Sequence, residues 1–414
     1  MPDDIEILTF GCRLNIWESE VMRRLAQQAG LQDAVIVNTC AVTAAAEKEA
    51  RQAIRRAKRD NPGRAIIVTG CAAQLRSSDF AAMPEVARVL GNADKLKPES
   101  WGLDSPKLLV SDVMAARETA AHLLDGFEGH ARAFVQVQQG CDHRCTFCII
   151  PFARGPSRSV PADEVFQATR QLVDHGYREV VLTGVDLTAW GGDLPGAPTL
   201  GDLAAAILYE IPELERLRLS SLDPVEIDER LWRLLAEELR LMPHLHLSVQ
   251  AGDDLILKRM KRRHARVDVI AVAERARRLR PNVVLGADLI AGFPTETEAA
   301  FANTLRLIED AGLTWLHVFP YSARPETPAA RMPPVSGSII KQRAAILREA
   351  GDAAAAQFMA SRLGAHARII GERGGIGRSE HYAPVRPDRP IPVGASAAVY
   401  LSRIEDGVLI GEVI

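Results

Sequence analysis

The 414-residue sequence lacks any uninterrupted run of 18 apolar residues, and its first residues, MPDDIEILTFGC, have neither the basic region nor the longer apolar region of a secretory leader. These absences argue against a membrane-spanning helix and against a secretory leader. We therefore expect a cytoplasmic protein. The net charge is only −3, with 47% hydrophobic and 25% charged residues, and this neither supports nor excludes a nucleic-acid partner.

Cysteine is scarce, with six residues in the whole chain. Structural disulfides are rare in the cytoplasm, so we expect these thiols to be metal ligands, reactive groups or small core residues. Cys141, Cys145 and Cys148 lie close together, whereas Cys12, Cys40 and Cys71 are widely spaced.

Short apolar runs alternate with helical segments in residues 1–125. The runs IEILTF, AVIVNT and AIIVTG precede segments such as ESEVMRRLAQQAG and AAAEKEARQAIRRAKRD, which predicts a parallel α/β domain. Cys12, Cys40 and Cys71 each follow one of these runs, at the sheet edge where such domains bind ligands. The pattern favours a shared site; the alternative is that each cysteine is a small buried residue that closes a strand.

The alternation resumes at residue 134 with the runs FVQVQQ, REVVLTGV, RLRLSSL, HLHLSVQ, NVVLGADLIAGF and WLHVFPYS. Six such units predict a partial (β/α)6 barrel, shorter than the usual eight-unit barrel. Alternate strand residues are polar, as with Arg218 and Ser220 or His246 and Ser248, and this predicts a polar ligand cavity. Alternatively, these residues lie near strand ends, where polar residues are common.

Four short alternating segments, HARIIGER, GIGRSEHYAPVRP, ASAAVYLSRIED and GVLIGEVI, end the sequence after one long helical pattern. Gly and Pro turns separate them, which predicts a small all-β barrel. The predicted domains are therefore residues 1–125, 130–358 and 359–414.

The compact group Cys141, Cys145 and Cys148 has the spacing C-x3-C-x2-C and follows a predicted barrel strand. A structural zinc site and an electron-carrying four-iron cluster each use four ligands, and here only three thiols are close. Three thiolates would leave one iron without a protein ligand and open to a substrate. A disulfide or inert thiols are the alternative.

This spacing resembles the signature of radical S-adenosylmethionine (SAM) enzymes, with Phe147 at the aromatic position before the last cysteine. The resemblance implies that the open iron of a [4Fe–4S] cluster binds SAM. It also implies that the residues in contact with SAM lie at strand ends, at Thr183, Gly184, Val185, Ser248, Gln250, Ile290 and Gly292.

The stretches TFGCRLNIWESE, VIVNTCAVT, VTGCAAQ and GCDHRCTFCIIPFARGPSRS, with the β-rich tail, resemble the methylthiotransferase family from end to end. That family has an N-terminal domain, a radical SAM barrel and a C-terminal TRAM domain. The resemblance implies that Cys12, Cys40 and Cys71 bind a second [4Fe–4S] cluster. IIPFARGPSRS and HVFPYSARPETPAARM most resemble the MtaB-like branch, which converts N6-threonylcarbamoyladenosine at tRNA position 37 to its 2-methylthio form.

The partners implied by this resemblance are tRNA, an electron donor of the flavodoxin or ferredoxin type, and a sulfur source. The tail residues Arg378, His381, Tyr382 and Arg386, and the basic runs at 51–59 and 258–266, are candidate RNA contacts. Alternative substrates are isopentenyl-type adenosine in tRNA and an aspartate of a ribosomal protein. A non-catalytic Fe–S electron carrier or zinc scaffold is the alternative of another class.

Overall fold

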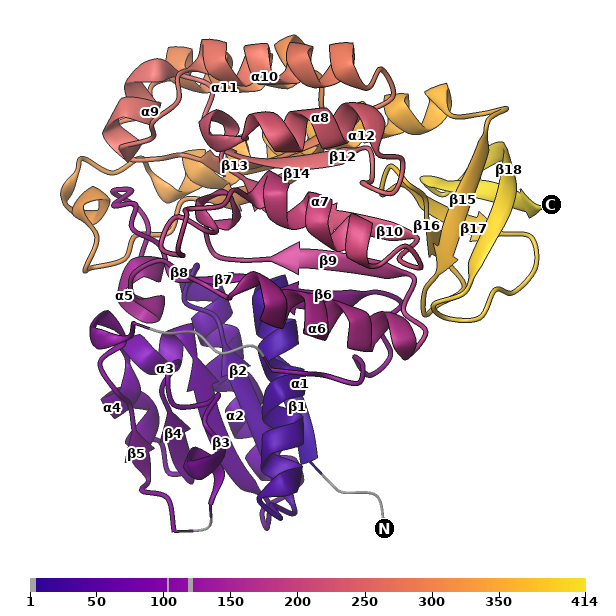
Figure 1. The fold of residues 1–414 in the computed structure, drawn as a ribbon. Coiled ribbons are helices and arrows are strands. Elements are labelled where there is room, and N and C mark those ends of the chain that lie inside the picture. The colour runs from indigo at the N-terminus through magenta and orange to yellow at the C-terminus, as the bar shows by residue number, and fades with distance from the viewer. Residues whose placement is uncertain (1–4, 103, 118–121) are drawn as a thin grey trace. The chain divides into compact units, whose positions relative to one another are not determined.

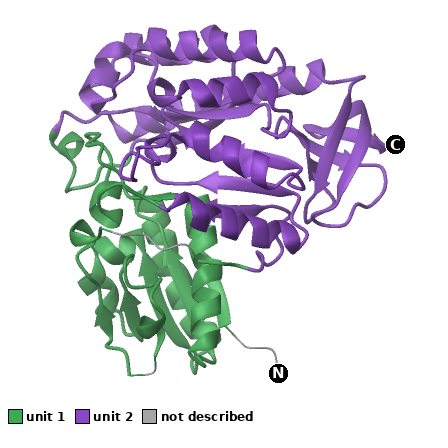
Figure 2. Ribbon diagram, viewed as in Figure 1, with its two compact units in different colours: residues 1–124, 138–159, 322–331 green, residues 125–137, 160–321, 332–414 purple. Residues whose placement is uncertain are grey.

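The computed structural model describes residues 5–102, 104–117 and 122–414 (Figure 1). Contacts group the chain into two compact units, shown in Figure 2. Unit 1 comprises residues 1–124, 138–159 and 322–331, and unit 2 comprises residues 125–137, 160–321 and 332–414. The loop that carries Cys141, Cys145 and Cys148 thus groups with the N-terminal residues. The three-domain division of the sequence stays a prediction.

Unit 1 is built on a parallel sheet of order β1-β2-β3-β4-β5, as the sequence predicts. Its strands are β1 (Ile5–Thr9), β2 (Ala34–Thr39), β3 (Ala65–Gly70), β4 (Arg88–Leu90) and β5 (Leu108–Leu109). Its helices are α1 (Arg13–Gln28), α2 (Ala44–Asp60), α3 (Cys71–Leu75), α4 (Ser77–Ala81) and α5 (Ile150–Arg154). β7 (Gln138–Gln139) and β8 (Arg158–Ser159) form an antiparallel pair.

Local sequence explains these elements. All six residues of β2 are buried, which suits a central strand rich in Val and Ile. Thr43 caps α2 by accepting a hydrogen bond from the backbone N–H of Ala46, and Lys58 and Arg59 lie in its last turn, where the helix dipole favours cations.

Unit 2 contains the partial barrel, in two parallel sheets of order β10-β9-β6 and β11-β12-β13-β14. The strands are β6 (Ala133–Gln136), β9 (Glu179–Thr183), β10 (Arg216–Leu219), β11 (Ser221–Leu222), β12 (His244–Gln250), β13 (Val284–Ala291) and β14 (Leu313–Pro320). The helices between them are α6 (Ala162–Asp174), α7 (Leu200–Glu210), α8 (Glu229–Glu237), α9 (Asp254–Met260), α10 (Arg266–Leu279) and α11 (Glu298–Asp310). The predicted six-unit alternation is confirmed, although the run RLRLSSL divides at Ser220.

The long helix α12 (Gly337–Ser361) leads into a closed β-barrel of order β15-β16-β17-β19-β18 (Figure 1). Its strands are β15 (His366–Gly371), β16 (Gly377–Arg378), β17 (Pro384–Pro387), β18 (Ser396–Glu405) and β19 (Val408–Val413). Ile369, Val385, Val399 and Leu409 fill it, and Met359 of α12 packs against them. The predicted small all-β barrel is confirmed.

A buried carboxylate in unit 2 links the partial barrel to the C-terminal barrel. Glu179 Oε1 lies 2.9 Å from the Nε atoms of both Arg132 and Arg218, and its Oε2 lies 3.4 Å from Nη1 of Arg216. Arg218 also donates to the backbone oxygens of Ser379 and Glu380, at 2.8 and 3.0 Å. Burial raises the pKa of Glu179, but Arg218, Arg132 and Arg216 outweigh it and hold that pKa at about 2.

This cluster removes Arg218 from the residues expected to line the polar cavity. Arg218 was expected to line it with Ser220, yet Arg218 is 2% exposed and its charge is offset by Glu179. Its guanidinium serves to join two parts of unit 2 and is not available to a ligand.

Among the described residues, no helix is both long enough and apolar enough to cross a membrane.

We predict that Glu179→Gln lowers the free energy of unfolding by about 3–5 kcal/mol at pH 7, because it leaves buried arginines without their carboxylate. The folded pKa of about 2 lies below the ordinary value of 4.5, so the stability contributed by Glu179 is present above pH 4.5 and is lost as pH falls toward 2. Urea unfolding from pH 7 to 2 measures both effects, and the variant should lose part of the pH dependence.

Glu213→Gln is the matched control, because Glu213 is 61% exposed and pairs with Arg170 at the surface. We expect this change to cost less than about 1 kcal/mol. Equal losses in the two variants would contradict the role assigned to Glu179.

Candidate functional site

Three cysteines of unit 1 follow neighbouring parallel strands. Cys12 is the N-cap of α1 after β1, Cys40 follows β2, and Cys71 begins α3 after β3. The pairing of β1 with β2 and of β2 with β3 brings these strand ends to one edge of the sheet. Gly11, with φ +102°, leaves room at this edge, because a Cβ there would lie 3.0 Å from the Cys40 sulfur.

The thiols at this edge are close enough to affect one another. Burial, together with the nearby Cys71 and Cys12, raises the pKa of Cys40 to about 11, against the lowering effects of a backbone hydrogen bond and of Arg154. Three thiolates gathered in one place repel each other unless a metal neutralises them. All three are free thiols. The donor set therefore fits an iron-sulfur cluster with one iron left open.

A buried polar network lies beside Cys71. Arg154 Nε lies 3.2 Å from the Cys71 sulfur, and Nη1 of the same side chain lies 2.7 Å from Oε1 of Glu18. Lys95 Nζ lies 2.6 Å from the other carboxylate oxygen of Glu18 and 2.8 Å from Oδ1 of Asn92. Burial raises the pKa of Glu18, but Arg154 and Lys95 outweigh it and hold that pKa at about 2.

Sequence reasoning missed this network. One signal was available, since Glu18 lies on the apolar face of α1 at helical spacing from Leu14, Val21 and Met22, all of which are buried. A charged residue on such a face requires a buried partner. The identity of the partner was not readable, because Arg154 is 136 positions away.

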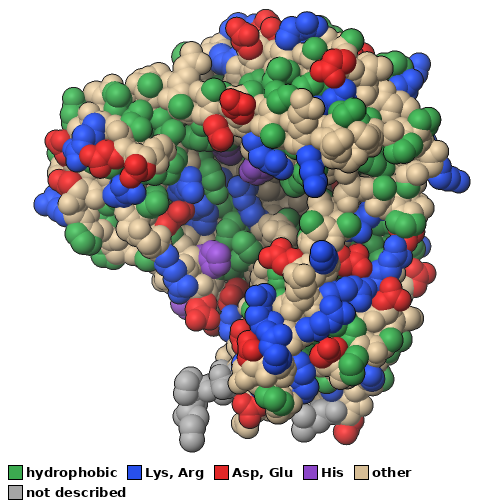
Figure 3. Space-filling model, turned by 180° about the vertical axis from the view of Figure 1, so that it is seen from behind, with side chains coloured by type: hydrophobic (Ala, Val, Ile, Leu, Met, Phe, Trp, Pro, Cys, Tyr) green, Lys and Arg blue, Asp and Glu red, His purple; other side chains and the backbone are tan. Residues whose placement is uncertain are grey.

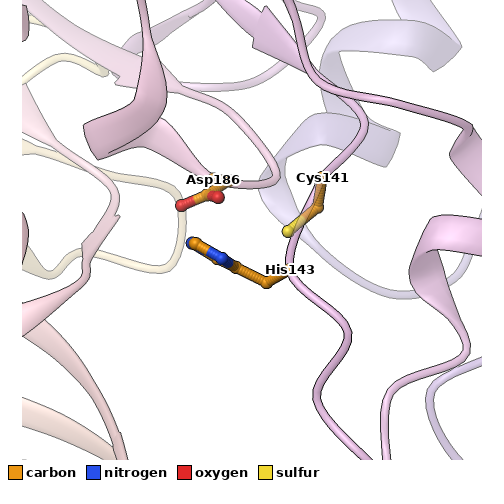
Figure 4. A group of neighbouring side chains, drawn as sticks. All are labelled: Cys141, His143 and Asp186. Carbon is orange, nitrogen blue, oxygen red and sulfur yellow. The ribbon is translucent and has the colours of Figure 1, made fainter. Parts of the chain in front are cut away.

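The loop after β7 carries Cys141, Cys145 and Cys148, all partly buried. Gly140 begins it with φ +74°, and a Cβ there would lie 1.9 Å from the backbone oxygen of Pro156, so only glycine fits. The backbone N–H of Cys141 donates to Gly155 O, and that of Cys148 donates to Cys145 O, each at 3.1 Å. Figure 4 shows the Cys141 and His143 side chains on this loop. This glycine-started turn holds three thiols within one short segment.

The predicted SAM contacts lie at the expected strand ends in unit 2. Thr183 ends β9 and is buried, while Gly184 and Val185 follow it and are partly exposed. Ser248 and Gln250 are partly exposed at the end of β12. On β13 and just after it, Ile290 is 8% exposed, and the backbone N–H of Gly292 donates to Glu296 Oε2 at 2.9 Å. Their role toward SAM stays a prediction, as does that of Phe147 in unit 1.

A second polar cluster of unit 2 joins three barrel strands. His246 Nε2 and His317 Nδ1 lie 2.9 and 3.1 Å from the same oxygen, Oδ1 of Asp288. Burial raises the pKa of Asp288, but the two histidines outweigh it and hold that pKa well below its usual range. His246 is buried and His317 is exposed, so the cluster reaches from the interior to the surface. This part of the polar face remains consistent with the predicted ligand cavity.

The candidate RNA contacts of the tail differ in exposure, and their role toward RNA stays a prediction. His381 is 4% exposed, and burial together with nearby arginines lowers its pKa to about 4, so its side chain is neither accessible nor charged at pH 7. Tyr382 stacks on His244 with ring centroids 5.2 Å apart and accepts a hydrogen bond from Arg132. Arg378 pairs with Glu372 at 3.4 Å. Of the four candidates, Arg386 is exposed, whereas Arg378 and Tyr382 are partly buried.

Charge is mixed over the surface that Figure 3 presents, where Lys and Arg side chains lie among Asp and Glu. On α2, the predicted basic run includes Arg55, Arg56 and Arg59, which are exposed, while Arg51 pairs with Glu47 at 3.3 Å. The exposed face of α2 therefore remains a candidate for phosphate contacts.

Two family models match the chain. The model described as the radical SAM superfamily covers residues 135–308, and the model described as uncharacterized protein family UPF0004 covers residues 4–91. Among solved structures, the radical S-adenosylmethionine methyltransferase TsrM from Kitasatospora setae aligns with a TM-score of 0.53 at 15% identity, over 76% of this chain and 67% of that one. This likeness concerns the fold.

Curated relatives extend over nearly the whole chain. The threonylcarbamoyladenosine tRNA methylthiotransferase MtaB of Rickettsia prowazekii is 50% identical over 404 residues, which are 98% of this chain and 96% of that protein. The protein of the same name from Bacillus subtilis is 36% identical over 78% of this chain and 74% of its own length. A tRNA-2-methylthio-N(6)-dimethylallyladenosine synthase from Novosphingobium aromaticivorans is 36% identical over 80% and 78%. The chain belongs to the methylthiotransferase family of radical SAM enzymes, in its MtaB branch.

Proposed function

We propose that this enzyme adds a methylthio group to C2 of N6-threonylcarbamoyladenosine at position 37 of tRNA. The observation that carries the proposal is the 50% identity over 98% of the chain to a protein named for this activity. The two sets of three free cysteines support it, because the reaction needs both a radical source and a place to hold sulfur. A tRNA substrate also favours a cytoplasmic location.

The two cysteine sets would hold separate clusters. Cys141, Cys145 and Cys148 would hold the [4Fe–4S] cluster expected of a radical SAM enzyme, and this cluster with bound SAM supplies the radical chemistry. Cys12, Cys40 and Cys71 would hold a second cluster.

Residues at the strand ends of unit 2 would position SAM. The backbone after Thr183 would bind its methionyl amine, Ser248 and Gln250 its ribose, and Ile290 with Gly292 its adenine. The partly exposed polar groups at these ends offer hydrogen bonds, and the buried Ile290 offers an apolar surface for a base.

The partners follow from this chemistry. Arg386 and the exposed arginines of α2 would contact the phosphates of the tRNA anticodon stem and loop. An electron donor of the flavodoxin or ferredoxin type would reduce the clusters, and a separate sulfur source would supply the sulfur atom.

We predict that tRNA from a strain lacking this protein contains threonylcarbamoyladenosine but no 2-methylthio-threonylcarbamoyladenosine. Nucleoside analysis of digested tRNA by liquid chromatography and mass spectrometry measures both. Restoring the wild-type chain should restore the methylthio form, and a chain with Cys145→Ala should not.

The same analysis separates the alternatives. Loss of the methylthio group from isopentenyl-type adenosine would support the second candidate substrate, which is favoured by the 36% identity to a dimethylallyladenosine synthase. Unchanged tRNA together with an unmodified aspartate in a ribosomal protein would overturn the proposal.

We predict different defects for the two cysteine sets. Cys12→Ala should keep reductant-dependent release of 5′-deoxyadenosine from SAM but lose methylthiolation, because the radical source is intact and the sulfur site is not. Cys145→Ala should lose both. Anaerobic reconstitution of the wild-type chain should give about eight irons, since each of two clusters holds four.

Identical behaviour of the two variants would contradict separate roles for the two sets. About one zinc per chain and no cleavage of SAM would instead indicate a non-catalytic scaffold.

A further inference from the structure

Arg154 uses all of its hydrogen-bond donors in the interior of unit 1. A guanidinium has five N–H groups. Four of them point to oxygen atoms of neighbouring side chains, as follows: Glu18 Oε1 at 2.7 Å, Gln139 Oε1 at 3.0 Å, Asn15 Oδ1 at 2.8 Å and Glu18 Oε2 at 3.1 Å. The fifth, on Nε, points to the sulfur of Cys71 at 3.2 Å. Arg154 is 2% exposed, so water does not replace any of these acceptors.

The charges of this network do not cancel. Arg154 and Lys95 are two cations, and Glu18 is one carboxylate, which leaves one positive charge among side chains that are at most 2% exposed. An isolated charge in such a place is costly. An anionic sulfur at Cys71, next to Nε of Arg154, offsets the excess.

We infer that Arg154 is a positioning residue for the Cys71 ligand and that its positive charge raises the reduction potential of the cluster bound through Cys12, Cys40 and Cys71. A cation and a hydrogen bond at a ligand sulfur favour the reduced cluster, which is the more negative one. The inference rests on the proposed function, because it requires a second cluster at these cysteines.

The position of Arg154 in the chain connects the two cysteine sets. Arg154 ends α5, the short helix that follows the Cys141, Cys145 and Cys148 loop. The residue that supports one cysteine set is therefore supplied by the segment that carries the other set. Lysine cannot replace it fully, because an ammonium has three donors on one nitrogen and cannot span the five acceptors.

The test compares Arg154→Gln and Arg154→Lys in a full-length chain that also carries Cys145→Ala, so that only the second cluster is present. The measurements are iron content after anaerobic reconstitution and the reduction potential from a dithionite titration followed by electron paramagnetic resonance. Arg154→Gln should disfavour the reduced cluster at least tenfold, which is a shift of about 59 mV to more negative potential for one electron. Arg154→Lys should give an intermediate potential.

Arg24→Gln is the matched control, since it removes the same charge from an exposed position on α1 and should leave the potential unchanged. If Arg154→Gln does not fold, Arg154→Lys still provides the comparison. A potential equal to that of the parent chain in the folded Arg154 variants would overturn the inference. A parent Cys145→Ala chain that binds no iron would overturn the second cluster, and with it the proposed function.

Discussion

The organisation of unit 1 depends on the ion pairs that the buried carboxylate of Glu18 forms. It lies on α1, yet its two partners, Arg154 and Lys95, come from distant parts of the chain. Burying two cations costs several kcal/mol for each, and Glu18 is the carboxylate that both of them contact. Because Arg154 also contacts the sulfur of Cys71, the position of this carboxylate determines the surroundings of a candidate cluster ligand that it does not itself touch.

Glu179 likewise compensates the charge of buried cations in unit 2, but its network joins different elements. Two of its arginine partners, Arg216 and Arg218, donate to backbone oxygens of the C-terminal barrel, and the third, Arg132, donates to the hydroxyl of Tyr382. The Glu18 network lies beside a candidate ligand site, and the Glu179 network attaches the C-terminal barrel to the rest of unit 2. Both combine several long cationic side chains with one carboxylate that is fully buried, so the location of each carboxylate decides which elements are held together.

The sequence was most informative where structure is determined locally. The run AVIVNT became β2, and the segment AAAEKEARQAIRRAKRD became α2 with the same bounds, because burial pattern and capping residues lie within each segment. β4 and β5 were missed, since three and two residues are too few to show a period. The run FVQVQQ divides after Val137 between the two units, and its sequence pattern does not reveal this division.

For the candidate site, the sequence identified the residue types that chemistry requires but not the residues that surround them. Six cysteines stood out because thiols are rare in this chain and their spacing has meaning. Arg154, Glu18 and Lys95 did not, because a charged residue is usually at the surface and its burial depends on contacts between distant segments. The surroundings of the tail residues were unreadable for the same reason: His381 is buried and Tyr382 stacks on His244, so both contact other side chains of unit 2, and their role toward RNA stays a prediction.

The inward-facing arginines of unit 2 bear on how this protein could be re-engineered. One could exchange the C-terminal barrel with that of a relative in order to change tRNA preference. Such an exchange assumes that this barrel is an independent module. Here Arg216 and Arg218 donate to backbone oxygens of the barrel, and Arg132 donates to the hydroxyl of Tyr382. A chimera would therefore need to preserve the backbone path around residues 368 and 378–382, or carry the matching arginines with the new barrel.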